Sequence, residues 1–299
     1  MELESDKNRE SPSKAKSATP PQLKTPVYQA LHAARYQRQA LIREIQEQTN
    51  NRLLAYVGPK ASVNRDDTLG IVELLQSVPC ETNIDLLLHT PGGDIDAAEK
   101  SMALLRRAVG TAKLRVIVPD FAKSAGTLMA VAADVVVMSD SSELGPIDPQ
   151  IVLDDGRGNA IQHSVLSYID AFNGHSEALR SDPNDPVARV MLNKIDPATL
   201  NVYTAVKERA RRLAEDHLNR GMRVPNFTEI ANKLIDNKRW LTHGQMIGYQ
   251  AAQGLKLKIE YLPPEDELWR LFWQLYCQQR LAVKDQEKLF ESDFVSLIM

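Results

Sequence analysis

Cysteine is almost absent from this sequence. Its 299 residues include only Cys80 and Cys277, which lie far apart and lack the spacing of metal ligands. A pair placed in this way predicts neither a disulfide framework nor a zinc site. No metal site is expected at Asp94 and Asp96 either, since no third ligand follows at a useful spacing and acids are typical of a helix start. A reducing, cytoplasmic location fits this usage.

Long apolar runs, aromatic residues and a strong net charge are also lacking. No run of 18 apolar residues occurs, and the polar N-terminus does not resemble a secretory signal. Aromatic residues make up 6% of the chain and the formal net charge is −3, whereas nucleic-acid surfaces are basic and often carry aromatic platforms. We therefore expect a soluble globular protein without a nucleic-acid partner.

Composition and hydrophobic periodicity divide the chain into four parts. Residues 1–26 are rich in Ser, Lys, Pro and Glu, which predicts a disordered tail. Apolar residues at helical spacing predict an amphipathic helix over residues 27–50. Alternating strands and helices over residues 51–262 predict one α/β domain, and residues 263–299 follow as a helical extension.

Two short turns, each between an apolar strand and a helix, stand out in the domain. They follow predicted strands at residues 84–89 and 114–119, and their sequences are Pro91-Gly92-Gly93 and Lys123-Ser124-Ala125-Gly126. Because the carboxyl ends of parallel strands meet at one sheet edge, both turns should open on the same edge. A serine at a helix start lies among unpaired N–H groups, as a nucleophile with an oxyanion hole requires. Serine is also common there as a simple helix N-cap, but the glycine turn thirty residues earlier favours the nucleophile.

The order of these motifs resembles the Clp/crotonase-fold serine peptidases, and within them the serine dehydrogenase proteinase family, which is related to signal peptide peptidase A. The residues that carry the resemblance are Pro91-Gly92-Gly93, Lys123-Ser124-Ala125-Gly126, Ala133-Asp134 and Leu144-Gly-Pro-Ile-Asp-Pro149. The resemblance covers roughly residues 50–262. It implies an α/β fold of stacked ββα units with helical N- and C-terminal appendages, assembled as a homo-oligomer.

The same resemblance implies a serine endopeptidase that acts on peptide or protein substrates without ATP, metal or another cofactor. Ser124 would be the nucleophile, and the backbone N–H groups of Gly93 and Ala125 would form the oxyanion hole. An extended substrate would pair with the backbone after Gly92.

The general base departs from the pattern of these families. Clp proteases place a histidine shortly after the serine, where this chain has the histidine-free run at residues 146–149. The signal peptide peptidase A group uses a lysine farther downstream, but no lysine occurs between Ser124 and Arg189. We rank Lys194, the first lysine after the serine, above His163, and expect His243 to be a capping or packing residue.

Two other functions stay open at this point. A crotonase-type acyl-CoA enzyme would use the same two turns to hold a thioester oxygen. A catalytically inactive scaffold would account for the histidine and lysine that are missing at the family positions.

Three further segments carry expectations about structure. Residues 154–158 are typical of a hairpin turn, and the polar residues 173–186 of a mobile surface loop. Residues 267–281 are apolar around most of a helix and must be buried against the body, a neighbouring subunit or a membrane surface. We favour a subunit contact, with a peripheral membrane contact as the alternative.

Overall fold

The computed structural model describes residues 25–154 and 160–299. Nearly all of the predicted tail and most of the turn predicted at residues 154–158 lie outside these ranges. The helix predicted over residues 27–50 is present as two helices, α1 (Pro26–Leu31) and α2 (Ala33–Thr49), which meet at His32.

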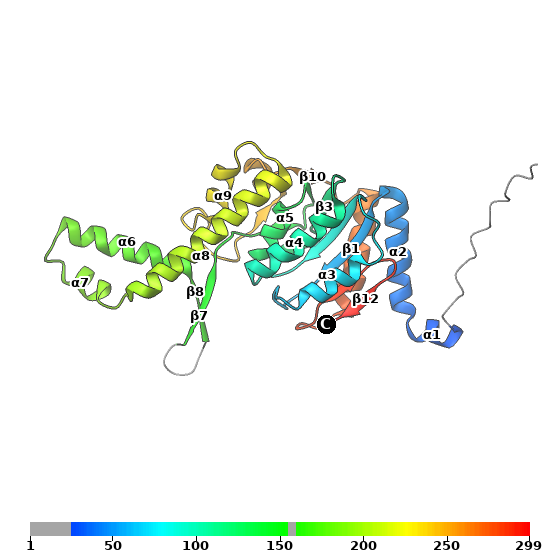
Figure 1. The fold of residues 1–299 in the computed structure, drawn as a ribbon, viewed down its shortest axis with the longest axis horizontal. Coiled ribbons are helices and arrows are strands. Elements are labelled where there is room, and N and C mark those ends of the chain that lie inside the picture. Colours follow the sequence, from blue (N-terminus) through cyan, green and yellow to red (C-terminus); the bar gives the residue numbers. More distant parts are fainter. Residues whose placement is uncertain (1–24, 155–159) are drawn as a thin grey trace, which may run out of the picture.

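A seven-stranded sheet forms the centre of the body, in the order β10-β5-β3-β2-β1-β11-β12 (Figure 1). The strands are β1 (Arg52–Val57), β2 (Ile84–His89), β3 (Leu114–Ile117), β5 (Val135–Met138), β10 (Ile259–Tyr261), β11 (Leu289–Glu291) and β12 (Ser296–Ile298). The strands from β10 to β1 run parallel to their neighbours, and β11 and β12 are antiparallel. The predicted α/β class is confirmed.

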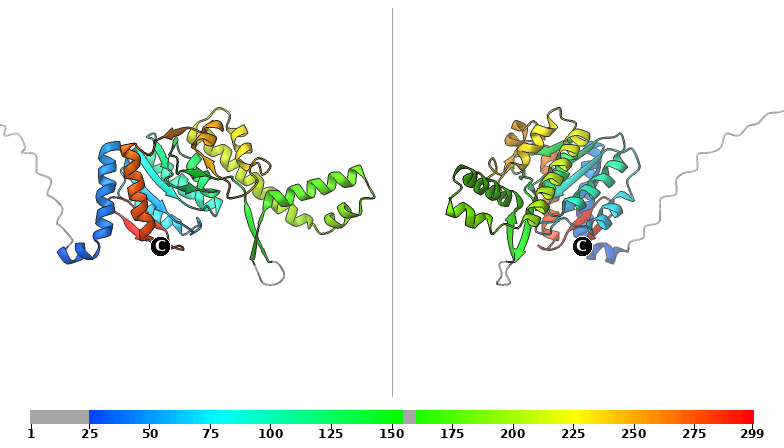
Figure 2. Two further views of the ribbon diagram at one scale, coloured as in Figure 1. Left: turned by 180° about the vertical axis from the view of Figure 1, so that it is seen from behind. Right: turned by 60° about the vertical axis from the view of Figure 1, so that its left-hand side comes forward.

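Helices cover both faces of the sheet, as the continuous apolar strands require. One face packs against α3 (Asp67–Leu75), α4 (Ile95–Val109) and α5 (Ala125–Val131). The opposite face packs against α2 and α11 (Glu267–Ala282), which lie side by side (Figure 2). Trp269, Phe272 and Leu275 of α11 are buried there. The subunit contact expected for the apolar face of this helix is therefore wrong, because its own chain covers that face.

The C-terminal residues belong to the same core. Strands β11 and β12 extend the main sheet beyond β1, and the Phe290 ring is fully buried. This ring fills the space above Gly70 in α3, where an added Cβ would lie 2.3 Å from it. Residues 263–299 are thus not a separate helical extension, and the boundary predicted after residue 262 does not divide the fold.

An arm projects from the body (Figures 1 and 2). It consists of the hairpin β7 (Gln150–Asp154) and β8 (Ala160–Ser164), then α6 (Val165–Ser181), α7 (Pro186–Leu192) and the first part of α8 (Pro197–Asp216). The loop predicted at residues 173–186 is wrong, because α6 continues to Ser181. Packing of α6 against α7 and α8 around Val165, Ile169 and Tyr203 overrides the weak local helix propensity.

The remaining elements return the chain to the body. They are the π-helix η1 (His217–Met222), α9 (Phe227–Ile235), α10 (Tyr249–Gly254) and the short strands β4 (Phe121–Ala122), β6 (Glu143–Leu144) and β9 (Ile247–Gly248). Within residues 25–154 and 160–299, no helix has the length and apolar character needed to cross a membrane.

Candidate active site

The glycine turn and the serine turn are in direct contact. Gly92 has a φ of +97°, and a Cβ at this position would lie 2.5 Å from the Lys123 carbonyl oxygen and 2.9 Å from the Ser124 Cβ. Only glycine combines this φ with such a close approach. The parallel pairing of β2 with β3 brings the two turns to one sheet edge, as predicted.

Ser124 occupies an unusual backbone conformation at the start of α5. Its φ of +51° and ψ of −113° are rare for a residue with a side chain. The hydroxyl does not cap α5, so the structure does not support the N-cap alternative. A strained serine at the turn into a helix is typical of nucleophiles whose Oγ must project from the backbone.

Two backbone amides beside this turn are available to a ligand. The Ala125 N–H opens α5 and has no intrahelical acceptor. On either side of Gly93, the Val63 N–H donates to the Gly92 oxygen at 2.7 Å and the Asp94 N–H donates to the Val63 oxygen at 2.9 Å. Within the described residues, the Gly93 N–H itself has no acceptor. An oxyanion hole needs donors of this kind.

A small second sheet joins three segments of the site. Its strand order is β4-β6-β9. Strand β4 leads into Ser124, β6 precedes the loop that contains Asp148, and β9 follows the loop that contains His243. These three side chains come from distant parts of the sequence, and the sheet holds their segments together.

Lys123 reinforces this connection. Its Nζ donates to the carbonyl oxygens of Leu144 at 3.2 Å and Gly244 at 3.3 Å, and it lies 3.1 Å from a carboxylate oxygen of Glu143. The lysine beside the serine is therefore occupied in binding the backbone of the neighbouring loops.

Ser124 lies in the wall of a cavity of about 540 Å³. Gly92, Gly93 and His243 are among the other lining residues. The Nδ1 atom of His243 is buried and has no hydrogen-bond partner in the described residues. It lies 3.7 Å from Oδ2 of Asp148, while the side chain as a whole is 32% exposed. The ring thus has one nitrogen turned into the protein and an accessible part at the cavity.

Asp148 is held firmly behind this histidine. It is 7% exposed. Its Oδ1 accepts a hydrogen bond from the Ser164 hydroxyl at 2.7 Å, and its Oδ2 accepts one from the Gln150 amide nitrogen. A carboxylate oxygen has two acceptor sites, so Oδ2 has capacity for a second donor.

The two residues that sequence reasoning favoured as the base lie elsewhere. Lys194 is exposed on the turn after α7, and α7 lies at the far end of the arm in Figure 1. His163 is exposed on β8, opposite Ile151. Neither side chain lines the cavity that contains Ser124. His243 lies in the loop before the short strand β9, and nothing local in the sequence links that strand to Ser124.

His89 lies beneath the glycine turn at the end of β2. It is 1% exposed, and its Nε2 lies 3.4 Å from the Tyr276 hydroxyl of α11. Burial lowers the pKa of His89 from 6.5 to about 4, with Arg280 lowering it further and Asp120 opposing the shift. This imidazole is a neutral residue of the core.

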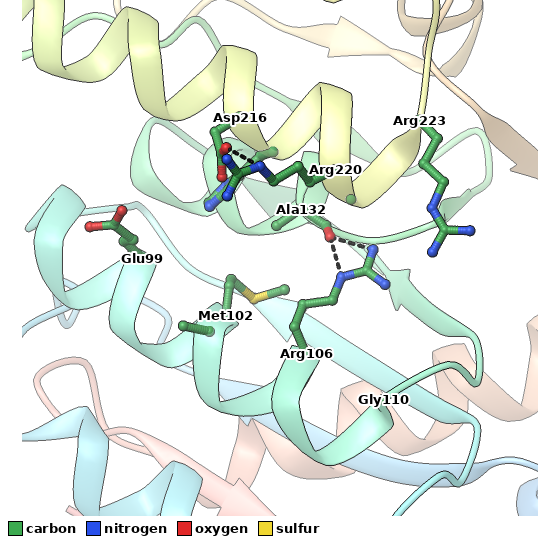
Figure 3. A pocket seen from close by; sticks show the side chains of 11 residues that line it. Glu99, Met102, Arg106, Gly110, Ala132, Asp216, Arg220 and Arg223 are labelled. Carbon is green, nitrogen blue, oxygen red and sulfur yellow. Dashed lines mark hydrogen bonds and ion pairs between the residues drawn. The ribbon is translucent and has the colours of Figure 1, made fainter.

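A second cavity lies at the other end of α5 (Figure 3). It has a volume of about 350 Å³ and lies between α4 and η1. Nε and a terminal nitrogen of Arg106 donate to the Ala132 oxygen at 2.8 and 2.6 Å, and Arg220 pairs with Asp216 at 2.8 Å. Because cations stabilise the carboxyl end of a helix, Arg106 supports α5 from the end opposite Ser124.

The described residues contain no group of three or more His, Cys, Asp and Glu side chains that could bind a metal ion.

Comparison with known proteins places this geometry in a family. The model of the ClpP-like SDH-type serine proteinases matches residues 23–165. The uncharacterized protein MJ1495 of Methanocaldococcus jannaschii is 33% identical over 245 residues, which cover 74% of this chain and 80% of that protein. This chain belongs to the ClpP-like SDH-type serine proteinase family. The matched range contains both turns and Asp148, and it ends before His243.

Other similar proteins have lower sequence identity. MJ0137 of the same organism is 27% identical over 262 residues, 84% of this chain and 81% of that protein. The structure of ClpP1 from Listeria monocytogenes has a TM-score of 0.41 at 12% identity, covering 75% of this chain and 98% of its own. A structure of the 1510-N membrane-bound stomatin-specific protease has a TM-score of 0.29 at 15% identity, and the match covers 72% of this chain and 99% of that chain.

Proposed function

We propose that this protein is an ATP-independent serine endopeptidase with Ser124 as its nucleophile. The observation that carries the proposal is the backbone of Ser124, which holds a positive φ in a turn packed against Gly92 at the wall of a cavity. Membership in a serine proteinase family supports the same chemistry.

In the reaction, the Ser124 Oγ attacks the carbonyl carbon of the scissile peptide bond. The N–H groups of Gly93 and Ala125 donate to the oxygen that becomes negative. Donors that are already in place act without reorganisation, and one such donor typically contributes about 10²–10³-fold to kcat. The amine leaves, and water then hydrolyses the acyl-enzyme.

The substrate in this proposal is an extended peptide segment. The Gly93 N–H is unpaired within the described residues, and extended peptides bind proteins through backbone groups of this kind. Backbone pairing adds affinity with little selection of sequence. The reaction needs no metal or organic cofactor.

A homo-oligomer completes the proposal. The outer part of the arm exposes apolar side chains, among them Val187 at 63% and Val190 at 55%. Exposed apolar side chains gathered on one element mark a surface that other proteins cover, and we expect a second copy of this chain to do so. The mass of the purified protein in light scattering checks this expectation.

The test of the nucleophile compares two serines of the same cavity. Ser62 is exposed and lines the cavity beside Ser124, so Ser62→Ala is a matched control for Ser124→Ala. We expect a fluorophosphonate probe to label the wild type and Ser62→Ala, and both to degrade casein. The Ser124→Ala variant should be neither labelled by the probe nor able to degrade casein.

Three other outcomes contradict the proposal. Labelling of Ser124→Ala would assign the nucleophile to another residue. A folded wild type that is unlabelled at every pH would be a catalytically inactive scaffold. Stabilisation by acyl-CoA in a thermal shift assay, without labelling, would instead favour the acyl-CoA enzyme.

A further inference from the structure

We propose that two polar side chains of the C-terminal segment, Tyr276 and Lys288, are positioning residues for the two turns of the active site. The family model matches residues 23–165, and both side chains lie beyond that range. The inference rests on the proposed function, because it assigns these residues a task in the reaction of Ser124. A catalytic site works well only when rigid neighbours hold its groups in place.

Tyr276 of α11 reaches the segment that leads into the serine turn. Its hydroxyl donates to Oδ2 of Asp120 at 2.7 Å. Asp120 directly precedes strand β4, and Ser124 follows that strand after one residue. Burial and the Asp120 carboxylate raise the pKa of the Tyr276 hydroxyl, so this group keeps its proton and stays a donor throughout the neutral range.

His89 links the same hydroxyl to the ends of both strands. The Phe121 N–H donates to Nδ1 of His89 at 3.5 Å, so Nε2 carries the proton of the neutral ring and faces the Tyr276 hydroxyl at 3.4 Å. The ring centroids of His89 and Phe121 lie 4.0 Å apart. Directly after His89, the Thr90 N–H donates to the Phe121 oxygen at 3.1 Å, and the Lys123 N–H donates to the Thr90 oxygen at 3.0 Å. This network joins the strand before the glycine turn to the strand before the serine turn.

Lys288 holds the glycine turn through a second buried network. Its Nζ lies 2.5 Å from Oδ1 of Asp67, the first residue of α3. Oδ2 of Asp67 accepts the Asn64 N–H at 2.9 Å. Val63, directly before Asn64, forms backbone hydrogen bonds on either side of Gly93. The loop beside the glycine turn is therefore tied to the C-terminal segment.

The two networks are better suited to fixing a geometry than to stabilising the fold. A buried ion pair contributes little net stability, because the loss of hydration offsets the attraction between the charges. A bonded polar network in the interior instead holds the groups that it joins in one arrangement. The groups joined here are the two turns, and a misplacement of about 1 Å at a reacting group can reduce the rate by about 10²-fold.

The first experiment compares Tyr276→Phe with Gln279→Met in the full-length protein. Each removes one side-chain hydrogen bond of a buried residue of α11. Within the described residues, the Gln279 amide bonds to Glu291 and to neither turn. We expect Tyr276→Phe to slow fluorophosphonate labelling of Ser124 by about 10–10²-fold. Gln279→Met should label as the wild type does, even where both variants unfold at the same lowered temperature.

The second experiment measures casein hydrolysis in the same preparations. Loss of positioning should lower kcat and kcat/KM by the same factor in Tyr276→Phe and leave KM within about twofold. A raised KM with an unchanged kcat would overturn the positioning role. Lys288→Met keeps most of the side-chain length without the charge, and we expect the same pattern from it. Tyr276→Phe keeps its ring and its burial, so it tests the proposal even where Lys288→Met does not fold.

The outcomes separate this inference from the proposed function. Wild-type rates in folded Tyr276→Phe would overturn the positioning role but leave the nucleophile intact. An equal loss of rate in Gln279→Met would assign the effect to general loosening of α11 and would overturn the role as well. A wild type that is never labelled would overturn both proposals.

Discussion

Gly92→Ala is the sharpest test of how the site is built. The new Cβ would lie 2.5 Å from the Lys123 oxygen and 2.9 Å from the Ser124 Cβ, at a φ of +97°. A strained backbone conformation costs about 1–3 kcal/mol, and overpacking costs about 1–3 kcal/mol more. If the protein still folds with the turn unchanged and bears both costs, the free energy of unfolding falls by about 2–6 kcal/mol, which lowers Tm by roughly 5–20 °C.

The chain can instead relieve the contact by moving the serine turn. Reaching an ordinary separation requires a displacement of about 1 Å, and a misplacement of this size can reduce the rate of a catalysed reaction by about 10²-fold. We therefore expect Gly92→Ala to lower Tm, the rate of fluorophosphonate labelling, or both. Differential scanning fluorimetry and labelling kinetics measure the two effects on one preparation.

Gly174→Ala is the matched control. Gly174 lies within α6 and has no atom within 4 Å of an added Cβ. Alanine in a helix interior is more stable than glycine by about 0.5–1 kcal/mol, so this variant should label normally and unfold at the same or a slightly higher temperature. If Gly92→Ala matches the wild type in both assays, the two turns are not packed as described.

Two further predictions concern stability. In the folded protein His89 has a pKa of about 4, whereas a histidine in the unfolded chain takes up its proton near pH 6.5. Between these two pH values the unfolded state therefore binds more protons than the folded state. The contribution of His89 to the free energy of unfolding is complete above pH 6.5 and is lost as pH falls toward 4. Urea unfolding should therefore show a loss of stability of about 2 kcal/mol between pH 7 and 5. An equal loss in the His89→Phe variant would show that His89 is not its source. Phe290→Ala leaves a cavity at a fully buried site and should lower the free energy of unfolding in urea by about 3–5 kcal/mol. Phe294→Ala, at a side chain that is 69% exposed, should change this free energy little. Equal losses in the two variants would show that the C-terminal hairpin is not part of the core.

The arm shows where local pattern misleads. Residues 173–186 contain Gly, Asn, Ser, Asp and Pro and predict a loop, but α6 continues through Ser181. Residues 267–281 show the converse. Their apolar surface predicted a helix correctly, but the sequence did not reveal that α2 and the sheet of the same chain cover it. Helix α6 depends on packing against α7 and α8, and the burial of α11 depends on α2, which is distant in sequence.

The sequence alone determined the two apolar strands and the two turns that lead into the site. Strand β2 has the predicted bounds, because an apolar run is a local property that folds in the same way in many contexts. The position of both turns at one sheet edge followed as well, since parallel strands bring successive turns to the same edge, whereas the close approach of Gly92 to Ser124 is seen only in the structure.

The tertiary structure alone decided which polar side chains share the cavity with Ser124. Lys194 and His163 are nearer to Ser124 in sequence, but they lie on the arm outside the cavity. His243 lines the cavity because the short strand β9 pairs with β6, about a hundred residues earlier in the chain, and β6 pairs with β4. Strands of two residues carry almost no local signal, so their pairing, and with it the place of His243 in the cavity, is set by packing rather than by sequence pattern.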